Sequence, residues 1–100
     1  MTRAALTIAG NRLAVSGVLD FESVLVIDTQ GQDWLTTTSP AQCELDLGGV
    51  GYSSSVGVAL VLGWLRAAIR ANKTLIVKNL PTDMAALARV GGLEKLLSPS

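Results

Sequence analysis

The segment Tyr52-Ser53-Ser54-Ser55 is the part of the chain whose residue types could do chemistry, because three hydroxyl groups precede a predicted long helix. A helix N-terminus favours negative charge through its free N–H groups and its dipole, so a hydroxyl there can carry a phosphate or be presented to a partner. Serine is also a preferred N-cap, and Ser53 or Ser54 could fill that role. The segment alone leaves capping and presentation open.

Catalysis by these serines is disfavoured. The chain has no histidine to activate a hydroxyl, and no lysine stands at Ser-x-x-Lys spacing. Its carboxylates are scattered, and the one pair that shares a strand face, Glu44 and Asp46, is predicted to lie in solvent. Metal-ligand spacing and a Gly-x-x-x-x-Gly-Lys-Ser/Thr phosphate loop are both missing. We therefore expect no catalytic residues, no metal and no cofactor.

The composition narrows the classes of partner. A formal net charge of +0 argues against nucleic-acid binding. Hydrophobic residues make up 49% of the chain and charged residues 16%, which indicates either an alanine-rich surface or an apolar patch that a partner covers. The single Cys43 excludes an internal disulfide. One cysteine also fits a reducing compartment. The longest apolar stretch, Val56 to Leu65, is too short to span a membrane, and residues 1–10 show no export signal.

Alternation of apolar and polar residues predicts the strands that must position this segment. Leu6 to Ile8 and Leu13 to Val15 flank Gly10-Asn11, which is typical of a β-hairpin. Two further strands are predicted, at Cys43 to Leu47 and at Thr74 to Lys78. Alternation means that only one face of the sheet is covered, because a doubly wound parallel sheet would have continuously apolar strands.

Capping residues and helical spacing predict the other elements. A helix begins at Phe21 after Asp20, and Gly31 disfavours its second half. The remaining predictions are a loop over Thr36 to Pro40, a loop from Gly48 to the serines, a helix from Ser55 to Ala71, a helix capped by Thr82 with Met84, Leu87 and Val90 inward, a stop at Gly91-Gly92, and a last turn bearing Leu93, Leu96 and Leu97. Residues 1–100 thus form a single domain, a two-layer α/β sandwich with a mixed four-stranded sheet and helices on one face.

The long helix has an apolar arc of roughly 200°, wider than one sheet face requires. Val61, Ala68, Trp64 and Leu65 lie at its centre, flanked by Val58, Leu60, Leu62 and Ile69. Either a neighbouring helix or a partner protein covers the excess. On the other side, Ala59 and Gly63 form a strip of small residues beside the serines that would allow another protein to approach closely.

Three segments in this order resemble the STAS domain family. They are the strand end Leu13 to Asp20, the strand Leu45 to Val50, and the turn and helix start Ser54 to Leu62. In the family pattern, Ser55 takes the position of the conserved Ser/Thr and Gly57 that of the glycine, whereas Ser54 replaces the usual Asp. Val56 stands where anti-sigma factor antagonists carry a second serine, often the phosphorylated one.

The resemblance implies a STAS-like sandwich and a non-catalytic role. The missing Asp and the Val56 substitution favour the MlaB-like type, a cytoplasmic subunit held at the inner membrane by an ABC phospholipid transporter that maintains outer-membrane lipid asymmetry. Its partner would be the MlaF-like ATPase subunit, in a complex with a permease and a periplasmic lipid-binding subunit. The alternative is an anti-sigma factor antagonist that binds a kinase, with Ser55 in the phospho-acceptor-like position. The implied partner-binding residues are Tyr52, Ser53, Ser54, Ser55, Val56 and Ala59.

Overall fold

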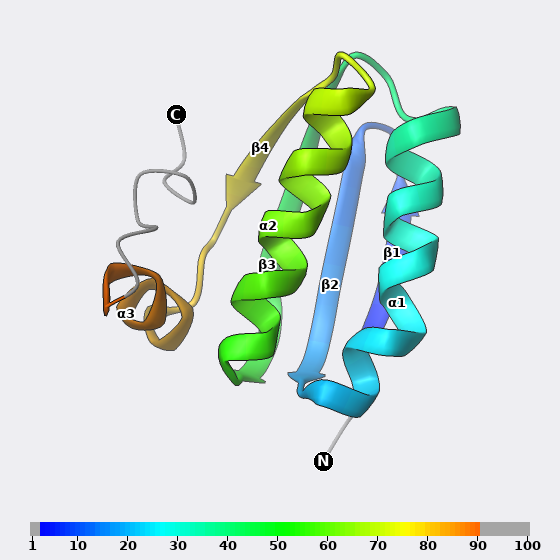
Figure 1. The fold of residues 1–100 in the computed structure, drawn as a ribbon. Coiled ribbons are helices and arrows are strands. Elements are labelled where there is room, and N and C mark those ends of the chain that lie inside the picture. The colour runs from blue at the N-terminus through cyan, green and yellow to red at the C-terminus, as the bar shows by residue number, and fades with distance from the viewer. Residues whose placement is uncertain (1–2, 91–100) are drawn as a thin grey trace.

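A four-stranded sheet lies behind two long helices that run side by side across one of its faces (Figure 1). The structure, a computed structural model, describes residues 3–90. No helix within these residues is long and apolar enough to cross a membrane. The elements are β1 (Ala5–Ala9), β2 (Arg12–Leu19), α1 (Phe21–Asp33), the π-helix η1 (Trp34–Thr38), β3 (Gln42–Ser53), α2 (Ser55–Arg70), β4 (Thr74–Lys78) and α3 (Thr82–Val90).

The strands lie in the order β1-β2-β3-β4. The β1–β2 hairpin is antiparallel, with Ala9 opposite Arg12, and the β2–β3 and β3–β4 pairs are parallel. Helices α1 and α2 provide the crossovers between the parallel strands, and α3 follows β4 beside the sheet (Figure 1). The predicted mixed sheet and α/β class are confirmed.

Strand alternation places the core between the sheet and the helices. Leu13 and Leu45 are completely buried against the helices. On the opposite face, Arg12 lies 3.1 Å from Glu44 and 3.4 Å from Asp46, in ion pairs that remain accessible to water. Glu44 and Asp46 therefore belong to a partly solvated strand face, as the alternation predicts.

Helix α1 continues beyond Gly31 because this glycine gives space to Trp64. The indole of Trp64 is fully buried, and a Cβ at Gly31 would overlap it. The indole Nε1 donates hydrogen bonds to the main-chain oxygen and to Oδ1 of Asp28, at 3.2 and 3.1 Å. Close packing on α2 therefore outweighs the low helix propensity of glycine, and the expected weakness of the second half of α1 is not observed.

The predicted loop over Thr36 to Pro40 is wrong in its first half, where residues 34–38 form η1. Trp34 and Leu35 are buried and anchor this turn to the core. The hydroxyls of Thr36 and Thr37 donate back to main-chain oxygens one turn earlier, at 2.9 and 2.5 Å. The run of polar residues was therefore interpreted as a loop, although the threonine hydroxyls donate to the helix backbone and do not end the helix.

The predicted loop from Gly48 is also wrong, because β3 continues to Ser53. Gly49 pairs with Ser16, and a side chain at Gly49 would place its Cβ 2.8 Å from the Ser16 Cβ. The register shifts twice along this part of the ladder, between Ala14 and Ser16 and between Gly17 and Val18. Glycine-rich sequence here reflects close strand approach and bulges rather than a turn.

Helix α3 differs from the prediction in its buried face. Met84 and Ala88 are buried, as i and i+4 neighbours, whereas Leu87 is partly exposed and Val90 is 89% exposed. Thr82 is the first residue of the helix rather than the residue before it. The stop at Gly91-Gly92 and the last turn with Leu93, Leu96 and Leu97 lie outside the described residues.

The Gly31–Trp64 contact predicts opposite results for two glycine substitutions. Gly31→Ala should lower the free energy of unfolding by about 1–3 kcal/mol, because the added methyl overpacks the core. Gly63→Ala should instead raise it by about 0.5–1 kcal/mol, because no atom lies within 4 Å of a Cβ at that position in α2. Urea denaturation of the two variants checks this, and a stabilised Gly31→Ala would contradict the packing argument.

The cap of α1 predicts a pH dependence. The Asp20 carboxylate accepts from the Ser23 N–H at 2.9 Å, and this hydrogen bond, with that from the Ser23 hydroxyl, holds the pKa of Asp20 below its ordinary value of 3.8. Asp20 therefore stabilises the fold above that value and loses this effect as the pH falls through its lowered pKa. Asp20→Asn keeps a capping oxygen but does not titrate, so its unfolding free energy should fall less steeply in acid. Equal slopes in denaturation series would refute this.

Candidate functional site

The three serines lie where β3 ends and α2 begins, and each has a different environment. Ser54 is the N-cap of α2: its Oγ accepts from the Val56 N–H at 3.3 Å and donates to the Leu19 main-chain oxygen at 3.4 Å. The Ser54 N–H donates to the same oxygen at 3.0 Å. The capping interpretation of Ser54 is therefore confirmed, and this cap joins the start of α2 to the end of β2.

Ser53 is buried beneath the turn, with 3% of its surface exposed. Its Oγ donates to the Ser54 main-chain oxygen at 2.8 Å, and its N–H donates to Oδ2 of Asp83 at 3.3 Å. These contacts tie the turn to the start of α3. Ser53 thus supports the turn from below, although its sequence position suggested a surface residue.

Gly57 allows the first turn of α2 to lie directly on the sheet. A Cβ at this position would overlap the Ser53 Oγ and would lie 3.1 Å from a methyl group of Leu19. Leu19 is itself fully buried. Any side chain at Gly57 would displace the helix start from the strand ends, and the exposed residues of the turn would move with it.

The remaining predicted residues are uncharged and lie at one end of the molecule. Tyr52 is 52% exposed, Ser55 and Ala59 are exposed, and Val56 is half-buried. Within the described residues, the Ser55 hydroxyl makes no hydrogen bond that would hold it inward. The structure therefore brings together Ser54, Ser55, Val56 and Ala59 at the start of α2. Ser53 is buried beneath them, and Tyr52, its neighbour in β3, points to the opposite face of the sheet.

A groove between α1 and α2 continues from this turn. Its volume is about 190 Å³. One polar lip is fixed by a hydrogen bond of 3.0 Å from Gln32 Nε2 to Asp28 Oδ1, the same oxygen that accepts from Trp64. The lining residues are Val24, Asp28, Gln32, Val56, Ala59, Leu60 and Gly63. The strip of small residues predicted from sequence, Ala59 and Gly63, thus lines this groove on the α2 side.

Two apolar residues of α1 border the groove and were missed by the sequence analysis. Phe21 is 68% exposed and Leu25 is 62% exposed. They lie seven and three positions before Asp28, so all three share one side of the helix. Their spacing relative to the buried Val24 and Ile27 could have revealed them, because it places two large apolar residues outside the core stripe.

Helix α2 buries a narrower arc than its sequence predicts. Ala67 and Ala68 are buried, but Ile69, placed in the apolar arc from sequence, is 72% exposed. Helix α1 covers part of the excess through the Gly31–Trp64 contact, so the neighbouring-helix alternative accounts for the centre of the arc. The groove and the exposed apolar residues around the turn are the part that no helix among residues 3–90 covers.

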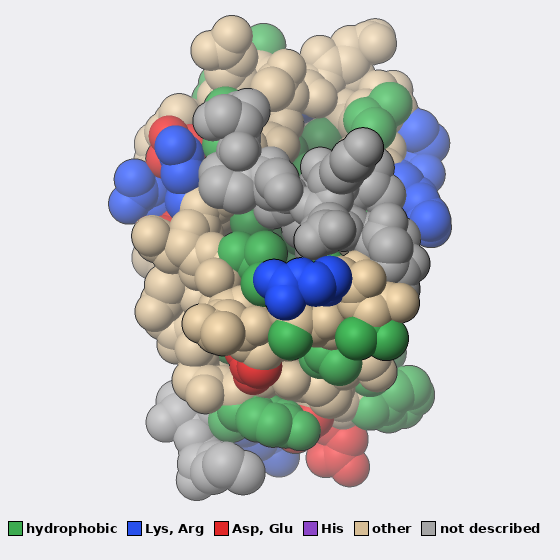
Figure 2. Space-filling model, turned by 90° about the vertical axis from the view of Figure 1, so that its left-hand side faces the viewer, with side chains coloured by type: hydrophobic (Ala, Val, Ile, Leu, Met, Phe, Trp, Pro, Cys, Tyr) green, Lys and Arg blue, Asp and Glu red, His purple; other side chains and the backbone are tan. Residues whose placement is uncertain are grey.

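The chemistry available at this surface is contact rather than catalysis or metal binding. Residues 52–59 carry no charged side chain. Within residues 3–90, no three His, Cys, Asp or Glu side chains come together to hold a metal ion. Figure 2, which views the molecule from the side of α3, shows hydrophobic side chains in separate groups over the lower half of that face, with acidic and basic side chains between them. A neutral surface such as that of residues 52–59 binds by shape and by burial of apolar area.

Comparisons with known proteins agree with this fold. A family model described as "Mlab, STAS domain" matches residues 3–98. No curated protein sequence matches the chain. Among solved structures, the anti-sigma factor antagonist SpoIIAA in its unphosphorylated form is similar over 92% of this chain and 83% of its own, with 19% identity and a TM-score of 0.72.

Two further structures show related folds. The phosphorylated form of the Bacillus cell fate determinant SpoIIAA is 21% identical, covering 92% of this chain and 86% of its own, with a TM-score of 0.68. A structure described as Mglu is 19% identical over 78% of this chain but only 20% of its own, with a TM-score of 0.60. At these identities the likeness shows the shared fold alone.

The separate environments of Ser54 and Ser55 predict different costs of removing each hydroxyl. Ser54→Ala should lower the free energy of unfolding by about 0.5–2 kcal/mol, because α2 loses its N-cap. Ser55→Ala is the matched control and should change it by less than about 0.5 kcal/mol, since its side chain is exposed. Chemical denaturation measures both. A larger loss for Ser55→Ala would mean that the cap is assigned to the wrong serine.

Proposed function

The chain belongs to the Mlab STAS domain family, and from that premise we propose that it is a non-catalytic subunit that binds and supports the ATPase of an ABC phospholipid transporter. In this role it assists a transporter that maintains outer-membrane lipid asymmetry, and it is held at the inner membrane by the complex, which also contains a permease and a periplasmic lipid-binding subunit. The observation that carries the proposal is the uncharged, apolar surface at the N-terminus of α2.

The exposed apolar residues near that surface support a lasting complex, because a partner would bury them. Phe21, Leu25 and Tyr52 are each more than half exposed, which is costly for a domain that meets only water. Phe21 and Leu25 share a side of α1 with Asp28, at the lip of a groove that the Trp64–Asp28 and Gln32–Asp28 hydrogen bonds hold in place. A helix or loop of the ATPase can therefore dock without reordering this groove, which lowers the entropy lost on binding.

The residue types at the turn support the transporter role over a switch. Val56, at the second serine position of antagonists, has no hydroxyl and instead lines the groove. Tyr52, Ser55, Val56 and Ala59 provide the direct contacts in this proposal, while Ser53 and Ser54 position them. The subunit contributes no group to ATP hydrolysis and acts by stabilising the ATPase in its competent arrangement.

An anti-sigma factor antagonist is the second candidate, and one observation favours it. Ser55 is exposed at the first position of α2, where free N–H groups and the helix dipole would favour an added phosphate. The two SpoIIAA structures are of a phosphorylated and an unphosphorylated antagonist. In this role, phosphate on Ser55 would change the affinity for a partner kinase.

A pair of arginine substitutions on α2 tests the proposed surface. Ala59→Arg introduces a long side chain into the groove and should weaken binding to the ATPase about tenfold or more, because that side chain would fill the space that the partner occupies. Ile69→Arg adds the same charge at an exposed position outside the groove and should leave binding unchanged. Co-purification with the tagged ATPase measures both, with circular dichroism as the check on folding. Equal binding by the two folded variants would remove the groove from the interface.

Activity separates the two candidate functions. Adding this chain to the purified transporter should raise its ATP hydrolysis, and the native protein should have the intact mass of the unmodified chain. Unchanged hydrolysis together with a stoichiometric phosphate on Ser55 would overturn the transporter role in favour of the switch.

A further inference from the structure

The two edges of the sheet differ in how they are protected against pairing. Edge strands of natural proteins carry charges, prolines or bulges that prevent another strand from adding to them. The edge strand β4 ends in Lys78 and follows Lys73. The exposed Arg3 precedes the edge strand β1 and forms an isolated bridge with Val18. The strand itself, with the sequence ALTIA, has no charge and no proline, and its register with β2 is unbroken over residues 5–9. Because alternate residues of an edge strand direct their N–H and C=O groups outward, β1 presents a ladder that no other strand among residues 3–90 covers.

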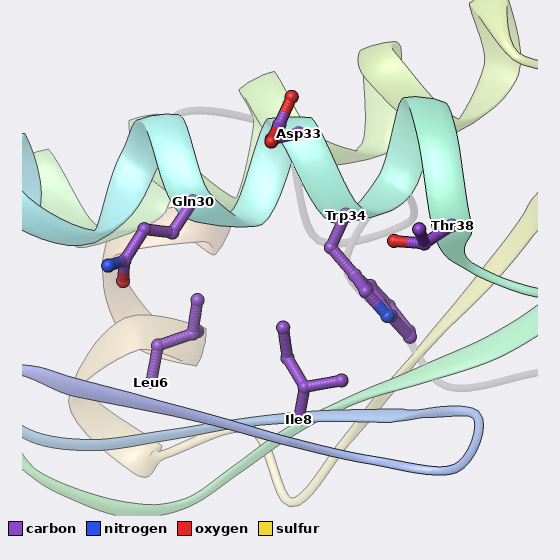
Figure 3. Close-up of a pocket in the computed structure, with 6 residues that line it drawn as sticks. All are labelled: Leu6, Ile8, Gln30, Asp33, Trp34 and Thr38. Carbon is purple, nitrogen blue, oxygen red and sulfur yellow. The ribbon is translucent and has the colours of Figure 1, made fainter.

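An open cleft runs along this edge, on the helix side of the sheet. Its volume is about 390 Å³, and β1, α1 and η1 line it. Figure 3 shows Leu6 and Ile8 rising from β1 toward the helix, with Gln30 above Leu6 and the Trp34 indole beside Ile8. Ile8 remains 46% exposed in this cleft. The edge therefore offers apolar side chains together with unpaired backbone groups.

We propose that β1 pairs antiparallel with β1 of a second copy of this chain, about a twofold axis that passes beside Thr7, so that two four-stranded sheets become one continuous sheet. In this register Leu6 of each copy lies opposite Ile8 of the other, and Thr7 lies opposite Thr7. The interface is isologous, because each strand presents to its partner the pattern that it receives. All helices remain on the same face of the joined sheet.

The uncharged sequence of β1 supports a second copy as the occupant. An antiparallel copy of the same strand opposes no like charges, and it sets the apolar Leu6 and Ile8 side chains against each other on the helix side of the sheet. The pairing covers Ile8 in both copies and leaves no charge between the strands, since β1 has none.

The proposed dimer is compatible with the proposed function and does not depend on it. Gln30 and Asp33 line the cleft at β1, whereas Asp28 and Gln32 line the groove toward α2. The two surfaces therefore lie on opposite sides of α1, and one chain can occupy both at once. A five-residue strand buries little area, so the pairing is expected to be reversible and to depend on concentration.

Disulfide trapping tests the register. Residues opposite each other in an antiparallel pair have Cα atoms about 4.5–5.5 Å apart, within the range a disulfide spans. Thr7→Cys should therefore give a covalent dimer under mild oxidation. Ala5→Cys is the matched control: it shares the exposed face of β1, but the twofold register sets it opposite Ala9, about 13 Å from its own counterpart. The native Cys43 is buried and should not compete. Cross-linking of both variants alike, or of neither, would overturn the proposed pairing.

Sedimentation equilibrium tests the association without any cross-link. The unmodified chain should shift from monomer to dimer as its concentration rises toward millimolar. Ile8→Lys should raise the dimer dissociation constant about tenfold or more, because it replaces the apolar contact with Leu6 of the other copy by a charge on the edge strand. Ile69→Lys adds the same charge on an exposed apolar site of α2 and should have no effect. A chain that stays monomeric at millimolar concentration, or an equal response to the two lysines, would refute the proposal whatever the outcome of the ATPase experiments.

Discussion

The contact between Trp64 and Gly31 sets the distance between the two helices that cover the sheet, and the candidate site depends on that distance. The indole is fully buried, lies where a side chain at Gly31 would be, and donates to Asp28 on the same helix. A bulkier residue at Gly31 would push α1 away from α2 and open the groove. The hydrogen bond also holds the Asp28 carboxylate at the groove lip, so one side chain fixes both the width and the polar edge of the surface.

A second close contact, between Gly57 of α2 and the strand ends at Leu19 and Ser53, sets the distance between the start of α2 and the sheet. Gly57 lets α2 begin directly on Leu19, and Ser53 and Ser54 hold that position through hydrogen bonds to main-chain atoms and to Asp83. Two of the three serines are therefore structural, and their hydroxyls are used within the fold. This division explains how a serine-rich turn can present an uncharged and mostly apolar surface, with only Ser55 directed to solvent.

Sequence patterns predicted the architecture because one face of the sheet packs on the helices and the other faces solvent, so apolar and polar residues alternate clearly in β2, β3 and β4. The predictions failed where the same residue type is compatible with two different structures. Gly48 and Gly49 were interpreted as a turn, although Gly49 serves close strand approach. On α3, Leu87 and Val90 are more apolar than Ala88, yet the helix buries Met84 and Ala88, because these two share the side that packs on α2 and β3. Phe21 was assigned only as a helix start, since exposure of an apolar residue depends on which neighbours the fold provides.

The central claim is that the surface formed by the turn at residues 52–59 and the adjoining side of α1 binds the ATPase of a transporter. Hydrogen–deuterium exchange of the chain alone and in complex with that ATPase tests it most directly, because exchange reports burial of backbone along the whole chain. The account predicts slower exchange in residues 52–59 and in the first two turns of α1, with β4 unchanged. Protection confined to other elements, or identical exchange with and without the ATPase, would contradict it.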